Sequence, residues 1–217
     1  MIKIRNLTKS YQSKLGPQVI FDNLTFDIPT NRNLAILGKN GAGKSTLFRM
    51  LAKSDYPDRG TIETRHKLSW PIALQTGVHP LMTGRENTRF IGRINGVRDV
   101  RQFEASVQDF AELGTKFDLP VKTYSSGMQA KLVFACCINI NFDIYLIDEA
   151  TSVGDPAFKQ KAKAAMLSKR DFSNIIMVSH DLKQIREFCE SGIVLTGGKL
   201  EYFADVENAI EHYMKPA

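Results

Sequence analysis

The chain has 217 residues, 43% hydrophobic and 24% charged, which is typical of a globular protein that forms one compact domain. No apolar run reaches the roughly 18 residues of a membrane-spanning helix, and the first residues lack a signal-peptide stretch, so we expect a cytosolic chain. The net charge of +6 suggests an acidic partner but does not distinguish ATP from nucleic acid or an anionic membrane surface. Because the basic residues form no run of like charge, we expect no direct nucleic-acid binding.

The first third of the chain reads as rich in strands. Apolar residues open the sequence over residues 2–7 and alternate with polar residues over 24–28, as on half-buried strands. Residues 33–37 form a short apolar run that ends in glycine, which predicts a buried strand. From Gly43 the spacing becomes helical, and a turn is predicted at residues 57–60.

The remainder predicts a helical layer followed by alternating strands and helices. Residues 83–118 read mainly as helix. The later alternation favours a parallel sheet with covering helices. The elements predicted there are strands over residues 144–147, 174–178 and 192–195, and helices over 156–167 and 181–188.

The three cysteines match neither a zinc site nor a redox pair. Cys136 and Cys137 are adjacent, and Cys189 is distant in the sequence. We interpret them as buried apolar thiols in a reducing compartment.

The strongest motif is a complete phosphate-binding loop that follows the predicted buried strand and precedes a helix. It consists of Gly38, Lys39, Asn40, Gly41, Ala42, Gly43, Lys44 and Ser45. Its glycines let the backbone curl so that N–H groups point at phosphate oxygens, and the following helix offers its positive end to the same anion. We expect Lys44 to reach the β- and γ-phosphates and Ser45 to ligate Mg²⁺, with Thr46 beside them in the nucleotide site.

A second apolar strand ends in two carboxylates, Asp148 and Glu149. Alone, this pair would be two ordinary acidic residues at the surface end of a strand. Beside a phosphate-binding loop it predicts nucleotide hydrolysis, with Asp148 holding the metal through water and Glu149 deprotonating the attacking water.

The run Tyr124, Ser125, Ser126, Gly127, Met128 and Gln129 resembles the signature motif of ATP-binding-cassette (ABC) ATPases. The resemblance implies that Ser125 and Gly127, at a helix N-terminus, contact the γ-phosphate held by a second copy of the chain, with the rest of the motif in the same nucleotide site. By itself, a Ser-Ser-Gly run is more often only a helix cap.

Other residues fall where that family places functional groups. The resemblance implies that Tyr11 stacks on adenine, although a core tyrosine is nearly as good a reading, and that Gln75 touches magnesium and the attacking water. Residues 152–155, ending at Asp155, match the loop that crosses the dimer interface. His180 matches the histidine that contacts the γ-phosphate and is counted with Glu149 and Lys44 as catalytic.

The resemblance covers essentially the whole chain and implies an α/β P-loop fold with a mixed sheet core, an N-terminal antiparallel β subdomain and a small helical subdomain. We expect a single domain over residues 1–217, with the helical subdomain over roughly 76–140. Ser126 and Met128 depart from the usual glycine and glutamine of the signature. They leave Ser125 and Gly127 in place, so we expect hydrolysis to survive, although its rate cannot be read from the sequence.

These departures, with residues 83–87 and 152–155, resemble the branch that exports polysaccharides, and most of all its capsular polysaccharide exporters. That resemblance implies a homodimer that binds ATP and Mg²⁺ and works with an integral-membrane ABC-2-type permease on the cytoplasmic face of a bacterial inner membrane. The substrate would be a lipid-linked polysaccharide handled by the permease; its identity is not encoded in this chain.

Three other classes share the cassette. A DNA-repair or chromosome-organising ATPase would need a long coiled-coil insertion, and no stretch between Gln75 and Tyr124 sustains a heptad repeat over that length. A translation factor of this family would carry two cassettes. A regulator without catalysis would not need Glu149 and His180.

Overall fold

The computed structural model of the chain describes residues 1–13, 16–72, 77–148, 155–170 and 172–215. These residues form two compact units. The first unit combines residues 1–71, 142–149 and 170–217, and the helical unit combines residues 72–141 and 150–169. None of the described helices is both long enough and apolar enough to cross a membrane. The expected single domain over residues 1–217 stays a prediction.

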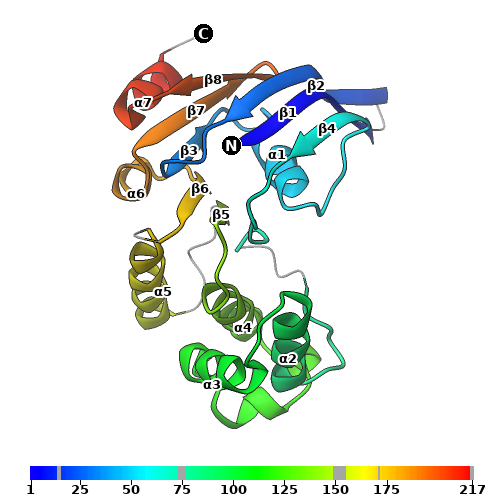
Figure 1. Cartoon of the computed structure of the whole chain (residues 1–217), viewed down its shortest axis with the longest axis vertical. Coiled ribbons are helices and arrows are strands. Elements are labelled where there is room, and N and C mark those ends of the chain that lie inside the picture. The colour runs from blue at the N-terminus through cyan, green and yellow to red at the C-terminus, as the bar shows by residue number, and fades with distance from the viewer. Residues whose placement is uncertain (14–15, 73–76, 149–154, 171, 216–217) are drawn as a thin grey trace. The chain divides into compact units, whose positions relative to one another are not determined.

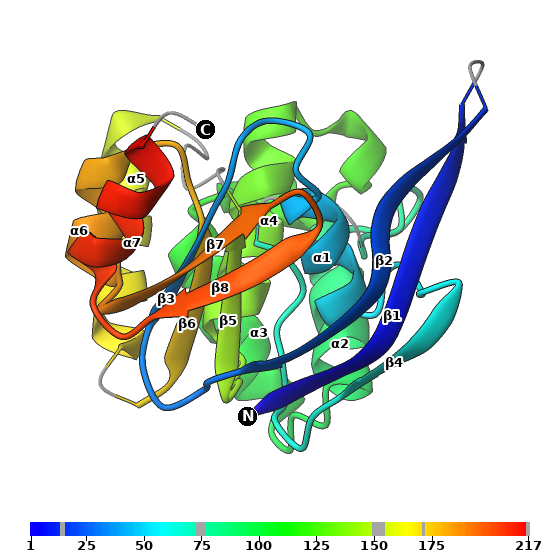
Figure 2. The same ribbon diagram turned by 90° about the horizontal axis from the view of Figure 1, so that it is seen from above.

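The first unit contains two sheets (Figures 1 and 2). A three-stranded antiparallel sheet has the order β2-β1-β4, and a five-stranded sheet has the order β5-β6-β3-β7-β8. The strands are β1 (Ile2–Ser13), β2 (Gly16–Ile28), β3 (Leu34–Leu37), β4 (Arg59–Glu63), β5 (Ile144–Asp148), β6 (Asn174–Val178), β7 (Ser191–Thr196) and β8 (Lys199–Phe203).

One hydrophobic core joins both sheets to helix α1 (Lys44–Leu51). Ile4 and Phe21 enter it from the antiparallel sheet, Ile36 from the larger sheet and Leu47 from α1, and all four are fully buried. Burial of such side chains stabilises a fold by about 1.5–3 kcal/mol each. The start of α1 is therefore fixed between two sheets. Helices α6 (Leu182–Phe188) and α7 (Val206–Met214) complete this unit.

The larger sheet is mixed. Strands β5, β6, β3 and β7 run parallel, and β8 returns antiparallel to β7. All four residues of β3 are buried, as a central parallel strand requires. Because parallel strands end at the same edge of a sheet, the segments after β3, β5 and β6 are brought together there.

The helical unit contains α2 (Gly84–Ile94), α3 (Val100–Ala111), α4 (Ser126–Ile138) and α5 (Pro156–Lys169) (Figure 1). Two short 3₁₀ helices, Gly114–Asp118 and Val121–Thr123, lie between α3 and α4. Thr83 begins α2 with a reciprocal capping box, because its hydroxyl accepts from the Glu86 N–H and the Glu86 carboxylate accepts from the Thr83 N–H.

The predicted fold class, with its antiparallel N-terminal sheet and mixed main sheet, is confirmed. Residues 83–118 are mainly helical, as predicted, and form two α-helices because α2 ends at Ile94 and Asp99 caps a new helix. The turn expected over residues 57–60 overlaps an edge strand, β4. The longest described helix, α5, has 14 residues, so the described part of the chain holds no long coiled-coil arm.

Candidate nucleotide site

The phosphate-binding loop joins the end of β3 to the start of α1. Gly43, the residue before the helix, has φ +105°, and Gly41 has φ +80°, in the left-handed region that favours glycine. A Cβ on Gly43 would also lie 2.7 Å from the side chain of Ile20. The Lys44 side chain is largely buried, and its ammonium donates to the carbonyls of Gly38 at 2.6 Å and Lys39 at 3.1 Å. The sequence therefore forms the curled loop and buried lysine of an anion-binding turn.

Asp148 and His180 reach the same edge from the neighbouring strands. Asp148 is the last residue of β5 and pairs in register with Val178, the last residue of β6. His180 follows two residues later, before Asp181 caps α6. Since β6 also pairs with β3, a carboxylate, an imidazole and the loop meet at one sheet edge.

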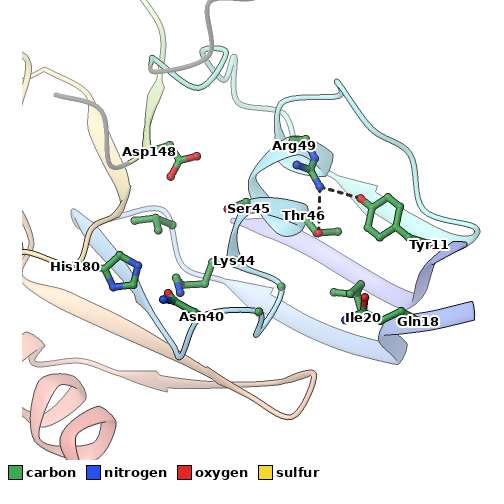
Figure 3. A pocket seen from close by; sticks show the side chains of 13 residues that line it. Tyr11, Gln18, Ile20, Asn40, Lys44, Ser45, Thr46, Arg49, Asp148 and His180 are labelled. Carbon is green, nitrogen blue, oxygen red and sulfur yellow. Dashed lines mark hydrogen bonds between the residues drawn. The ribbon is translucent and has the colours of Figure 1, made fainter. Parts of the chain in front are cut away.

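A hollow of about 370 Å³ connects these groups. Figure 3 shows Asp148 and His180 at one end, Tyr11 and Arg49 at the other, and Lys44 and Ser45 between them. The remaining lining residues are Gln18, Ile20, Asn40, Gly41, Gly43, Thr46 and Val178. One end is suited to phosphate and the other to an aromatic base.

Tyr11 is held at its end of the hollow by a polar network. Its hydroxyl donates to Asp55 Oδ2. The same hydroxyl accepts from an Arg49 guanidinium nitrogen at 3.1 Å (Figure 3). The Lys9 ammonium donates to Asp55 Oδ1 at 2.7 Å and lies 5.0 Å from the centre of the Tyr11 ring. Arg49 also donates to Thr46 Oγ1 at 3.3 Å, which links the ring to the helix that starts at the phosphate loop.

The charges in this network stabilise one another. Burial opposes ionisation of Asp55, but hydrogen bonds from Lys9 and Tyr11 outweigh it and lower the pKa of the Asp55 carboxyl. The hydrogen bond to Asp55 correspondingly raises the pKa of Lys9 against its partial desolvation. Both groups are therefore charged near neutral pH, and the network fixes the Tyr11 hydroxyl.

The signature run lies in the helical unit at the start of α4. Ser125 is the N-cap residue, and its hydroxyl accepts from the Met128 N–H at 3.2 Å. Ser126, Gly127, Met128 and Gln129 form the first turn, which leaves backbone N–H groups at the positive end of the helix.

Asp155, the last residue of the expected interface loop, lies before α5. Its Oδ1 accepts from the Phe158 N–H at 2.9 Å, and Lys131 donates to its Oδ2 at 2.6 Å. The Lys131 hydrogen bond is the main reason that the pKa of Asp155 falls to about 2. The carboxylate is half exposed, so this ion pair fixes a loop end rather than supplying much stability.

Some predicted site residues are not placed. Gln75, Glu149 and residues 152–154 lie outside the described residues. Three residues of the predicted loop, Gly38, Lys39 and Ala42, do not line the hollow. The carbonyls of Gly38 and Lys39 instead accept hydrogen bonds from the Lys44 ammonium. Sequence reasoning missed Gln18, Ile20 and Arg49. Gln18 is brought to the site because it pairs with Tyr11 between the antiparallel strands β1 and β2.

The three cysteines are all buried, as expected. Burial raises the pKa of Cys136 and of Cys189 to about 12, so neither is a reactive thiolate at neutral pH.

The fold and the hollow define a P-loop nucleotide-binding protein. Its sequence matches the ABC transporter family over residues 21–152. The chain therefore belongs to the ABC transporter family, as an ATP-binding protein with ATPase activity coupled to transport. The resemblance noted from the signature motif is confirmed.

Several relatives that match over nearly their full length are named for the transport or export of cell-surface polymers. The chain is 45% identical over 217 residues to the polysialic acid transport ATP-binding protein KpsT of Escherichia coli, covering 99% of each chain. It is 38% identical to the capsule polysaccharide export ATP-binding protein CtrD of Neisseria meningitidis, covering 98% of each chain. A teichoic acids export ATP-binding protein, TagH of Staphylococcus haemolyticus, is 36% identical, with 98% of this chain and 87% of TagH covered.

Solved structures support the fold. The structure of an ATP-binding subunit of an ABC transporter has a TM-score of 0.79 at 20% identity, covering 98% of this chain and 93% of that one. The ATP-binding cassette MJ0796, in a dimeric post-hydrolysis state with ADP and phosphate, has a TM-score of 0.74 at 23% identity, covering 93% of this chain and 97% of that one.

Proposed function

We propose that this chain is the ATPase subunit of an exporter of capsular or another cell-surface polysaccharide. The observation that carries the nucleotide part is the hollow in which Lys44, Ser45, Asp148 and His180 meet, with Tyr11 at the far end. The export part is supported by relatives of similar length whose names state polysialic acid transport and capsule polysaccharide export.

In this proposal each side chain has one task. Lys44 binds the β- and γ-phosphates, and His180 contacts the γ-phosphate. Tyr11 stacks on adenine. Glu149, which follows Asp148 in the sequence, takes the proton of the attacking water. The roles of Tyr11, Lys44 and His180 fit their order along the hollow.

A magnesium ion would be held by Ser45 and Asp148, together with Gln75. The hydroxyl and the carboxylate both line the hollow, and oxygen donors of this kind suit Mg²⁺. When bound, the ion would neutralise charge that develops on the phosphates.

The proposal further includes two copies of the chain and a membrane permease at the cytoplasmic face of the inner membrane. Ser125 caps α4, so the helix presents its positive end near the signature residues. In a pair of chains, that end would contact the γ-phosphate held by the partner's loop. Dimerisation of the cassette MJ0796 and the export names of the relatives support this arrangement.

Replacing Lys44 by alanine in the cell of origin tests the export function. Because the ammonium is lost from the phosphate loop, we expect surface polysaccharide to disappear while polymer accumulates inside the cell. Lys159→Ala, an exposed lysine of α5, is the control. Normal surface polysaccharide in the Lys44→Ala strain, with the variant protein present at the usual amount, would contradict the proposal.

A further inference from the structure

Arginine side chains gather around a second hollow, which lies entirely within the helical unit. Its volume is about 490 Å³, and its lining residues are Arg89, Arg93, Arg98, Asp99, Val100, Arg101 and Glu104. Its walls are the C-terminal half of α2, the connection after it and the first turn of α3. The two helices approach closely at Gly92, where a Cβ would lie 2.8 Å from the Phe103 ring.

The positive charge of this hollow is only partly neutralised. Glu104 is buried and accepts hydrogen bonds from both Arg85 and Arg89. Asp99 accepts from the N–H groups of Arg101 and Gln102, so it is engaged in capping α3. Within the part of the chain that the structure describes, Arg93, Arg98 and Arg101 make no ion pair. These three arginines therefore line a hollow whose two carboxylates, those of Asp99 and Glu104, are already engaged in other hydrogen bonds.

Exposed apolar side chains accompany these arginines. Phe90 is 48% exposed and Ile94 is 64% exposed, and both belong to α2. Phe90 and Ile94 stand four residues apart, as do Arg89 and Arg93, so the two pairs form adjacent stripes on the exposed side of α2. A site for a small soluble anion would need only the arginines. Basic side chains mixed with exposed phenylalanine and isoleucine are typical of segments that lie on an anionic membrane surface.

We infer that this arginine surface, defined as Arg89, Phe90, Arg93, Ile94, Arg98 and Arg101, binds the phosphate-bearing headgroups of anionic phospholipids. The guanidinium groups pair with headgroup phosphates, and the side chains of Phe90 and Ile94 enter the boundary between the headgroups and the acyl chains. We choose this ligand because its charge is complementary to the arginines and because exposed apolar side chains of α2 lie next to Arg89 and Arg93. This contact goes beyond the proposed pairing with a permease, because the chain would bind lipid without one.

Sedimentation of the full chain with vesicles tests the inference. We expect binding to vesicles that contain phosphatidylglycerol, weak binding to vesicles of phosphatidylcholine alone, and loss of binding as salt is raised. Each basic side chain near an anionic surface contributes a factor of about five in partition. The variant Arg93→Gln/Arg98→Gln/Arg101→Gln should therefore bind roughly 100-fold more weakly.

A matched variant, Lys116→Gln/Lys122→Gln/Lys159→Gln, removes the same charge from exposed lysines elsewhere in the helical unit and should bind nearly as the natural chain does. The variant Phe90→Ser/Ile94→Ser should bind roughly tenfold more weakly. ATPase activity in solution, which uses none of these residues, checks that each variant is folded.

Wild-type chain with no preference for phosphatidylglycerol would overturn the inference, and so would a triple arginine variant that binds like the lysine control. Binding of the arginine surface to an acidic polypeptide, without binding to the vesicles, would overturn it in favour of a protein partner.

Discussion

Replacing Tyr11 by alanine removes the aromatic ring from the base end of the nucleotide hollow and leaves the phosphate loop in place. The ring lines the hollow, its hydroxyl is bonded to Asp55 and Arg49, and Lys9 lies 5.0 Å from its centre. The ring is therefore held in position before any base arrives. Stacking of a base on an aromatic side chain contributes about 1–3 kcal/mol. Loss of the ring should weaken ATP binding roughly 5- to 150-fold.

Calorimetric titration with ATP and with inorganic tripolyphosphate separates the two ends of the site. Tyr11→Ala should lower the affinity for ATP and leave the affinity for tripolyphosphate, which has no base, nearly unchanged. Tyr11→Phe keeps the ring and should keep most of the ATP affinity. Tyr56→Ala, beside Asp55 in the sequence and 71% exposed, is the matched control. Equal losses for ATP and tripolyphosphate, or no loss for ATP, would refute the stacking role and favour a purely structural tyrosine.

Two further predictions concern stability. Asp55→Asn should lower the free energy of unfolding by about 2 kcal/mol near neutral pH, because charged hydrogen bonds to Lys9 and Tyr11 are lost. Since the folded pKa of Asp55 lies below its unfolded value of about 3.9, that difference is present above this pH and shrinks as pH falls through the folded pKa. Urea unfolding across the acid range measures it, and a difference that persists unchanged in acid would contradict the ion pair. Gly92→Ala should destabilise by about 1–3 kcal/mol through its clash with Phe103, whereas Gly127→Ala, with only Ser125 Oγ within 4 Å, should be neutral or stabilising in thermal unfolding. The same response at both glycines would argue against close packing of α2 on α3.

The phosphate end of the hollow, with Lys44, Asp148 and His180, was predictable from the sequence because these residues follow short local patterns. A buried apolar run before a glycine loop predicts β3 and the start of α1, and apolar runs before Asp148 and His180 predict β5 and β6. Parallel pairing then brings three strand ends to one edge. No long-range contact has to be known to reach that arrangement.

The base end of the site could not be predicted in the same way. Tyr11 meets Asp55 across 44 positions of sequence, and Arg49 meets Tyr11 across 38. Both contacts depend on how the antiparallel sheet packs over α1. The edge strand β4 was also missed, because only Ile62 of its five residues is even partly buried and the period of two is lost. The break between α2 and α3 was signalled by Asn95-Gly96, a turn-forming pair inside an otherwise helical pattern.

In the proposed mechanism, two copies of the chain bind ATP between them, and Glu149 then deprotonates the attacking water. The most direct test is the mass in solution of Glu149→Gln with MgATP, measured beside its rate of phosphate release. We expect a stable dimer that forms only with ATP and shows no turnover, since binding is kept while the general base is lost. A variant that remains a monomer with ATP bound, or that releases phosphate at the rate of the unaltered chain, would contradict the claim.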